Sequence, residues 1–262
     1  MSVSANARLV FPVMGTMGSI VVSGTDVDRL GEEAVAATLT SARSRLDDLE
    51  QRFSHYRGES DISRWVAGED VDAKAVAEIE HVLRECGRLH ADSDGVFRAR
   101  NPRTHALDTA GYVKGYAIGR AVEELRTQGL CNFVVGVGGD AFAAGVASDD
   151  RPWRIAVQDP HRSHGVVAMV EATDLAVATS GTAERGDHIW IGDDPVVTAA
   201  NMGILSFTVI GPDIAEADAY ATVGFAMGEA GMAWVAGHKG YRSVVVRPDG
   251  STVSDAALVS AA

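Results

Sequence analysis

The spacing of apolar and polar positions predicts three long amphipathic helices. In residues 27–51 and 72–90, apolar side chains recur every three or four positions, which aligns them along one side of a helix. The same spacing runs from about residue 116 to residue 128, and Gly129 then follows in the place of a C-cap glycine. Ser60 or Asp61 is a candidate N-cap for a further short helix. The apolar positions of the three helices are Leu30, Ala34, Ala37, Leu39, Ala42, Leu46 and Leu49; Val76, Ile79, Val82, Leu83, Cys86 and Leu89; and Ala117, Ile118, Ala121, Val122 and Leu125.

Short apolar runs between and after these helices predict strands. Residues 9–22 are expected to form a pair of strands around a glycine turn at 14–18. Further strands are expected at 132–137, 153–157, 166–170, 175–179 and 205–210. Strands in succession, with the helices gathered in separate blocks, favour an α+β fold over a regular series of βαβ units.

Composition and charge narrow the classes of function. The chain has 262 residues, of which 46% are hydrophobic and 23% charged, as in an ordinary globular protein. A net charge of −13 argues against general binding to nucleic acid or to an anionic membrane. No apolar run approaches the ~20 residues of a membrane span, and the N-terminal residues alternate rather than form an export signal, so we expect a cytoplasmic protein without membrane insertion. Cys86 and Cys131 have no metal-ligand spacing and are predicted to be buried small hydrophobic residues.

A glycine-rich stretch at residues 107–145 carries the first candidate chemistry. Asp108, Gly111 and Lys114 precede the third helix, and a Gly-Gly-Asp triplet at 138–140 follows the next strand. Glycines let backbone N–H groups approach an anion without a Cβ in the way, and a lysine supplies a point charge for phosphate. The stretch therefore predicts a cradle for a phosphorylated ligand.

The same stretch has two other interpretations. Residues 136–141 match the G-x-G-x-x-G/A fingerprint of dinucleotide-binding proteins, in which the glycines follow a strand and open a helix. Here a charged turn and another strand, 153–157, follow instead, which argues against a dinucleotide site. A glycine-rich hairpin without any ligand stays open as an interpretation.

A second candidate site lies in residues 215–222, which open an apolar helix. Asp218 and Thr222 are four residues apart and so share one helix face. A carboxylate and a hydroxyl are hard oxygen donors of the kind that Mg²⁺ prefers. The alternative is a capping aspartate beside a threonine that bonds to its own helix backbone.

The order of these motifs resembles that of the ApbE family, the FAD:protein FMN transferases, from about residue 14 to residue 228. The resemblance rests on motifs that occur in the family's order over most of the chain. They are Met14-Gly15-Thr16; Phe53-Ser54-His55-Tyr56 with Ser60-Asp61-Ile62-Ser63; Leu107-Asp108 with Gly111 and Lys114-Gly115-Tyr116-Ala117; Gly138-Gly139-Asp140; Thr179-Ser180-Gly181; Glu184-Arg185; His188-Ile189; and Asp218-Ala219 with Thr222.

Membership would imply a single two-lobed α+β domain over residues 1–262, with mainly antiparallel sheets flanked by helices. FAD would bind as substrate in a cleft between the lobes, with Mg²⁺ at its pyrophosphate. Family members split FAD and attach FMN to a threonine or serine hydroxyl of an acceptor flavoprotein, which releases AMP. Some members hydrolyse FAD to FMN and AMP instead. A third possibility is an FAD-binding module that has lost the chemistry.

The resemblance also implies roles for individual residues. Asp218, Thr222 and the carbonyl of Gly111 would bind the metal ion. His188 would act as the general base, because histidine titrates near neutral pH, and Lys114 would neutralise phosphate charge. The residues that would contact the flavin nucleotide are Met14, Tyr56, Asp108, Lys114, Gly138, Gly139, Asp140, Ser180 and Gly181.

Three departures from the family pattern fall in loops that would contact the flavin or the acceptor. The residues after His188 lack the Asp-Pro-x-Thr-Gly run, Ala183 stands where a tyrosine is expected, and Arg98 replaces an aspartate. Many family members are exported lipoproteins, whereas this chain shows no export signal. The acceptor is therefore expected to be a cytoplasmic protein or a domain that faces the cytoplasm.

Overall fold

In the computed structural model, residues 5–101, 104–162, 165–181 and 203–257 are described. Their main feature is an antiparallel eight-stranded sheet, and a separate two-stranded ribbon consists of β5 (Trp153–Gln158) and β6 (Val166–Ala172). The large sheet contains, in spatial order, β1 (Ala7–Val13), β2 (Thr16–Val22), β3 (Phe133–Val137), β4 (Asp140–Ala144), β7 (Leu175–Gly181), β8 (Ser206–Gly211), β9 (Arg242–Val246) and β10 (Thr252–Ser254). The predicted α+β class is confirmed.

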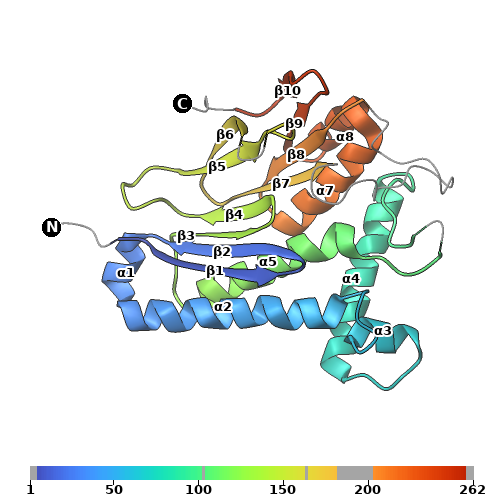
Figure 1. The fold of residues 1–262 in the computed structure, drawn as a ribbon, viewed down its shortest axis with the longest axis horizontal. Helices are drawn as coiled ribbons and strands as arrows, with labels where there is room; N and C mark the ends of the chain where they lie inside the picture. The colour runs from blue at the N-terminus through green and yellow to red at the C-terminus, as the bar shows by residue number, and fades with distance from the viewer. Residues whose placement is uncertain (1–4, 102–103, 163–164, 182–202, 258–262) are drawn as a thin grey trace.

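The helices of this part of the chain cover one face of the sheet, and the β5–β6 ribbon packs on the other (Figure 1). In β8, Phe207 and Val209 belong to the core shared with the helices, whereas Ile210 packs with Val170 of the ribbon. Successive residues of a strand face opposite sides of a sheet, so a strand covered on both sides buries every position. This explains why all six residues of β8 are buried.

The β1–β2 and β3–β4 connections are both two-residue hairpin turns; the first was predicted, whereas β4 was not predicted as a strand. Met14 and Gly15 have φ values of 51° and 73°, the left-handed pair typical of a type I′ turn. In the β3–β4 turn, Gly138 has a φ of 59° at the first central position, as in a type II′ turn. Val137 then pairs directly with Asp140, so the glycine-rich triplet leads into a strand and not into a helix. The dinucleotide-binding interpretation is excluded.

The first long helix of the sequence prediction is wrong in one respect, because residues 27–51 do not form a single helix. The structure has α1 (Gly24–Leu30) and α2 (Glu32–Phe53), separated at Gly31. Gly31 has a φ of 88°, a conformation that a helix cannot contain. The apolar spacing runs through the break and therefore conceals it.

The third predicted helix begins earlier than expected, since α5 spans Ala110–Thr127. Gly111 and Gly115 are therefore inside the helix, where they were predicted to lie in a loop. The predicted end is correct. Gly129 N donates to Arg126 O at 2.9 Å, and Leu130 N donates to Leu125 O at 3.0 Å, which is the Schellman motif expected of a glycine with a φ of 89°.

Helices α3 (Asp61–Val66), α4 (Ala73–Asp92) and α7 (Ile214–Met227) were predicted, and the short helix α8 (Gly231–Ala236) that follows them was not. Ser60 caps α3, and Asp72 caps α4. The helix that carries Asp218 is α7, capped by Asp213. The 3₁₀ turn η2 (Gly228–Ala230), α8, β9 and β10 follow and were not predicted, although the valine run of β9 is typical of a buried strand.

Two predictions about single side chains have opposite outcomes. Cys86 is buried in the core, as expected, but Cys131 is exposed beside the start of β3. Phe97 is also buried, with 2% of its surface exposed. Within the described residues, no helix is both long and apolar enough to cross a membrane.

Candidate active site

Several chain segments that carry candidate residues meet at one end of the large sheet. Gly138 N donates to Met17 O at 3.0 Å, which joins the β3–β4 turn to the start of β2. The antiparallel pairing of β4 with β7 puts the start of β4 beside the end of β7. Gly181, the last residue of β7, pairs with Ser206 at the start of β8. The β1–β2 turn, the β3–β4 turn and the end of β7 therefore share this end of the sheet.

Lys114 lies between two buried carboxylates near this end. Its Nζ is 2.7 Å from Asp140 Oδ2 and 3.8 Å from Asp218 Oδ1, and only 13% of the lysine side chain is exposed. Asp140 Oδ1 accepts a hydrogen bond from Thr179 N at 2.8 Å. The three charged residues come from α5, β4 and α7, so the cluster fixes two helices to the sheet. Lys114, predicted to contact phosphate, is thus held in place by Asp140.

Asp218 also joins α7 to α5 through the backbone. Its Oδ2 accepts a hydrogen bond from Gly115 N at 2.7 Å, and its side chain is 4% exposed. A Cβ at position 115 would lie 2.5 Å from Ile214 O, 2.7 Å from Asp218 Cβ and 2.9 Å from Ala215 Cα. Two of these three atoms belong to backbone and cannot turn aside. Gly115 is therefore required by the close packing of the two helices, and not by a loop.

We expect Gly115→Ala to lower the free energy of unfolding by about 1–3 kcal/mol, because the added methyl group forces α5 away from α7. Gly119→Ala is the matched control, one turn further along the same helix. Its Cβ would meet Ile214 Cγ2 at 3.5 Å, an ordinary contact, so that variant should gain about 0.5–1 kcal/mol from helix propensity. Urea unfolding of both variants measures the difference. Equal stabilities would show that α5 and α7 can separate at no cost.

Next to Asp218, hydroxyl groups from two elements approach each other. Thr222 Oγ1 lies 3.3 Å from Ser180 Oγ, which joins α7 to the end of β7. A Cβ on Gly111 would be 3.5 Å from Thr222 Oγ1 and 3.4 Å from Phe97 Cε2. The first turn of α5 is therefore close to the Thr222 hydroxyl, as a shared site for Gly111, Asp218 and Thr222 would require.

The charges and donors of this region fit a bound Mg²⁺ ion. Two carboxylates and one ammonium group give a local charge of −1, which would repel a phosphate unless a cation is added. In the described part of the chain, no three His, Cys, Asp or Glu side chains form a metal-binding group. The available donors are the Asp218 carboxylate and the hydroxyls of Thr222 and Ser180. Mg²⁺ suits such a set, since it takes few protein ligands and keeps water or phosphate for the rest.

His55 joins the loop after α2 to the first turn of α5. Its Nε2 accepts a hydrogen bond from Thr109 N at 3.1 Å and lies 3.0 Å from Thr109 Oγ1. The adjacent residue, Tyr56, is 100% exposed. Met14 is held by its backbone N–H, which donates to Glu50 Oε2 near the end of α2 at 2.9 Å. Tyr56 and Met14 thus stand on loops anchored to α5 and α2.

The other predicted residues are placed as follows. Asp108 is exposed, and its Oδ1 accepts a hydrogen bond from Ala110 N at 3.0 Å at the start of α5. Gly138 and Gly139 form the tip of the β3–β4 hairpin, with Gly138 exposed and Gly139 half-buried. His188 lies outside the described residues.

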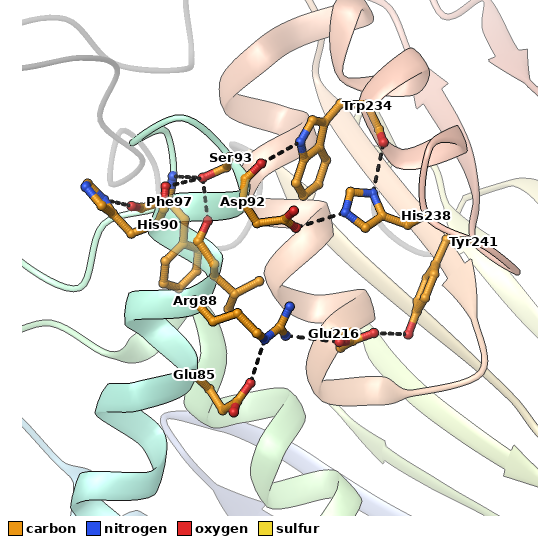
Figure 2. Close-up of polar contacts among 11 residues, drawn as sticks. Glu85, Arg88, His90, Asp92, Ser93, Phe97, Glu216, Trp234, His238 and Tyr241 are labelled. Carbon is orange, nitrogen blue, oxygen red and sulfur yellow. Dashed lines mark hydrogen bonds and ion pairs between the residues drawn. The ribbon is translucent and has the colours of Figure 1, made fainter.

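The end of α4 is tied to α7 and α8 by a polar network (Figure 2). His238 Nε2 lies 2.9 Å from Asp92 Oδ2, while its Nδ1 lies 2.9 Å from Trp234 O. Arg88, one turn earlier in α4, donates to Glu216 Oε1 at 3.0 Å. These contacts fix the point at which the chain leaves α4 for the loop that leads to α5.

The first residues of that loop are also fixed by hydrogen bonds (Figure 2). Ser93 Oγ donates to Leu89 O at 2.7 Å, and Phe97 N donates to Ser93 Oγ at 2.9 Å. His90 Nδ1 donates to Phe97 O at 2.8 Å. The loop therefore holds the Phe97 ring against Gly111, beside the Thr222 hydroxyl.

A groove of about 980 Å³ opens on a different face of α5. It is lined in part by Tyr116 and His81, and its charges are largely matched, for example between Arg45 and Glu78 at 2.6 Å. Lys114 and Asp218 are not among its lining residues. The groove is separate from the candidate site.

The region that contains the cluster also matches a family of known proteins. A family model described as the ApbE family matches residues 98–245, more than half of the chain. The chain belongs to the ApbE family. The matched residues include Lys114, Asp140, Asp218 and Thr222, whereas Met14 and the loop with His55 and Tyr56 precede them.

Curated relatives support this ApbE assignment. A Vibrio cholerae protein named FAD:protein FMN transferase is 29% identical over 171 residues, which cover 62% of this chain and 48% of that protein. A Rhodobacter capsulatus protein of the same name is 32% identical over 160 residues, covering 59% of this chain and 30% of that protein. The chain thus matches about half or less of the length of these relatives.

Solved ApbE structures share the fold over nearly the whole chain. Pseudomonas stutzeri flavinyl transferase ApbE in its apo form superposes with a TM-score of 0.76 at 21% identity, covering 97% of this chain and 96% of that one. The ApbE protein of Thermotoga maritima gives a TM-score of 0.75 at 20% identity, covering 95% and 97%. The two matches confirm the expected ApbE-like arrangement of antiparallel sheets flanked by helices.

The contact between His55 and Thr109 was not predicted from the sequence. In the sequence analysis His55 is named only as part of the motif Phe53-Ser54-His55-Tyr56, and no role was predicted for it or for Thr109. The two residues are 54 positions apart, and no local pattern indicates that they meet.

Proposed function

We propose that this chain is an Mg²⁺-dependent FAD:protein FMN transferase. It would cleave the pyrophosphate of FAD, attach FMN through a phosphoester to a threonine or serine hydroxyl of an acceptor flavoprotein, and release AMP. The observation that carries the proposal is that the ApbE match contains Lys114 and two buried carboxylates, gathered beside two hydroxyls at one end of the sheet. The names of the curated relatives support the same reaction.

The proposed step exchanges one bond at phosphorus. The acceptor oxygen forms a bond to the phosphorus of the FMN half, and the bond from that phosphorus to the bridging oxygen breaks. AMP leaves with the bridging oxygen, while the proton of the acceptor hydroxyl passes to a base, for which we propose His188. Water in place of the acceptor hydroxyl would give FMN and AMP.

The residues of the cluster suggest how the chain supports this step. Asp218, Thr222 and the carbonyl of Gly111 would hold Mg²⁺, which when bound would neutralise charge on the phosphate oxygens. Lys114 would add a second positive charge, and Asp140 would fix the lysine in position through the 2.7 Å contact.

The remaining predicted residues would bind the nucleotide. Tyr56 is fully exposed and so has a ring free to stack on the flavin or adenine, with Met14 as a second contact. Backbone groups of the Gly138-Gly139 turn and of Ser180-Gly181 would lie along the nucleotide, with Asp108 at the start of α5.

The proposal is tested by incubating the purified chain with FAD, with Mg²⁺ or with EDTA, and with a peptide that carries an acceptor threonine. We expect AMP release and a peptide that carries one phosphoester-linked FMN, only when Mg²⁺ is present. FMN and AMP without a labelled peptide would indicate an FAD pyrophosphatase. Bound but unchanged FAD under both conditions would leave a flavin-binding module and refute the transferase.

A further inference from the structure

The hydrogen bond between His55 and Thr109 determines which form the imidazole ring takes. A backbone N–H can only donate, so Nε2 of His55, 3.1 Å from Thr109 N, must act as the acceptor and carry no proton. The neutral ring then carries its proton on Nδ1. Burial lowers the pKa of His55, and the nearby charge of Asp108 only partly opposes that effect, so the electrostatic environment favours the same neutral form.

Thr109 is the residue from which α5 begins. It is the N-cap of the helix, it is completely buried, and its side chain makes no capping bond to the helix backbone. Its N–H is instead bonded by a residue from another part of the chain, His55. Two residues later comes Gly111, and one turn after that comes Lys114, which contacts Asp140.

The loop that precedes Thr109 is fixed at its far end by a separate set of contacts. Asp92, the last residue of α4, contacts His238 Nε2 through its carboxylate. Phe97 N donates a hydrogen bond to Ser93 Oγ. His55 supplies the side-chain anchor at the near end, because it accepts the hydrogen bond of Thr109 directly. A shift of the first turn of α5 would move the Gly111 carbonyl relative to Thr222 and Asp218.

We propose that His55 is a positioning residue for the reaction: as the neutral Nδ1–H tautomer, it holds Thr109 so that the first turn of α5 presents the Gly111 carbonyl to the metal ion and Lys114 to the phosphates of FAD. The inference rests on the proposed function. His55 acts through Thr109, and it couples the loop that bears Tyr56 to the helix that bears Lys114.

Two variants distinguish the role of Nε2 as a hydrogen-bond acceptor from the space that the ring fills. In His55→Gln, the side-chain Oε1 can take the place of Nε2 as an acceptor that does not titrate, whereas His55→Leu keeps bulk but has no acceptor. We expect His55→Leu to lower kcat for FAD cleavage by roughly 10- to 100-fold, the cost of a small misplacement in an active site. His55→Gln should stay within about threefold of the wild type near pH 7.5.

The pH dependence distinguishes positioning from a loss of packing. As the pH falls from about 7.5 to about 5, protonation of Nε2 removes the acceptor in the wild type but not in His55→Gln. The ratio of wild-type kcat to His55→Gln kcat should therefore fall toward acid pH, while a general base common to both proteins cancels from the ratio. The facing charge that bears on this titration is Asp108, which both proteins retain.

The ring and its neighbours can be observed without FAD. In ¹⁵N-labelled protein, we expect the His55 Nε2 signal of an unprotonated nitrogen and slow exchange of the Thr109 amide, which His55→Leu should accelerate. His81→Leu is the control, because the His81 ring packs in a tilted contact with the Tyr116 ring, with centroids 5.6 Å apart, away from the cluster. That variant should leave kcat and the Thr109 amide unchanged.

The outcomes are distinct. A wild-type protein that does not cleave FAD would refute the proposed function and the positioning role with it. Active wild-type protein with His55→Leu kcat within about twofold, or with His55→Gln as impaired as His55→Leu, would overturn only the inference. A proton on Nε2 in the NMR spectrum would overturn it as well.

Discussion

Replacing Asp218 with asparagine is expected to slow FAD cleavage by about 100-fold or more while the fold stays intact. The asparagine oxygen can still accept the hydrogen bond from Gly115 N, so the contact between α5 and α7 survives. The variant loses the negative charge of Asp218, beside the Thr222 and Ser180 hydroxyls. Asp218 is the one carboxylate among the proposed Mg²⁺ ligands. The local charge would change from −1 to 0, and the attraction for a divalent cation would fall accordingly.

The measurement is kcat/KM for FAD at increasing Mg²⁺ concentration, together with the thermal unfolding midpoint. We expect the variant to need far more Mg²⁺ and to unfold near the wild-type temperature. Glu216→Gln is the matched control, since it removes an acidic group from the same helix that instead contacts Arg88 and Tyr241. The control should cleave FAD at the wild-type rate. A rate for Asp218→Asn within about threefold of the wild type would refute the metal assignment.

The fold was predictable where local patterns decide it. The apolar spacing of α4, with Ile79, Val82 and Leu89 all buried, and the glycine turn at Met14 and Gly15 are examples in which sequence and structure agree. The division of residues 27–51 at Gly31 was not predictable, because a glycine with a φ of 88° and a glycine inside a helix look alike in the sequence. The early start of α5 was missed for the same reason.

The candidate site was predictable as a set of residues but not as a geometry. The motifs named Lys114, Asp140 and Asp218 separately, and only the pairing of β4 with β7 and the packing of α5 on α7 bring them together. The ion pair between Lys114 and Asp140 joins distant segments of the chain, and so does the hydrogen bond between His55 and Thr109. Spacing along the chain carries no information about such contacts. The roles of these residues stay predictions that the experiments above test.

Replacing Lys114 with methionine is expected to lower the free energy of unfolding by about 3–5 kcal/mol. The Asp140 side chain is 0% exposed and Asp218 is 4% exposed, so both carboxylates depend on the lysine for neutralisation. Methionine has a similar length and can fill the same space, which separates the loss of charge from the loss of volume. Removing one partner of a buried ion pair costs more than the pair contributes, because the remaining charge stays buried without compensation.

A double variant shows whether the loss comes from the unpaired charge. In Lys114→Met with Asp140→Asn, the asparagine oxygen can still accept the Thr179 N–H, but one of the two buried negative charges, that of Asp140, is gone. We expect the double variant to recover at least about half of the lost stability in urea unfolding. A single variant that loses less than about 1 kcal/mol, or a double variant no more stable than it, would mean that Lys114 does not hold the two carboxylates together.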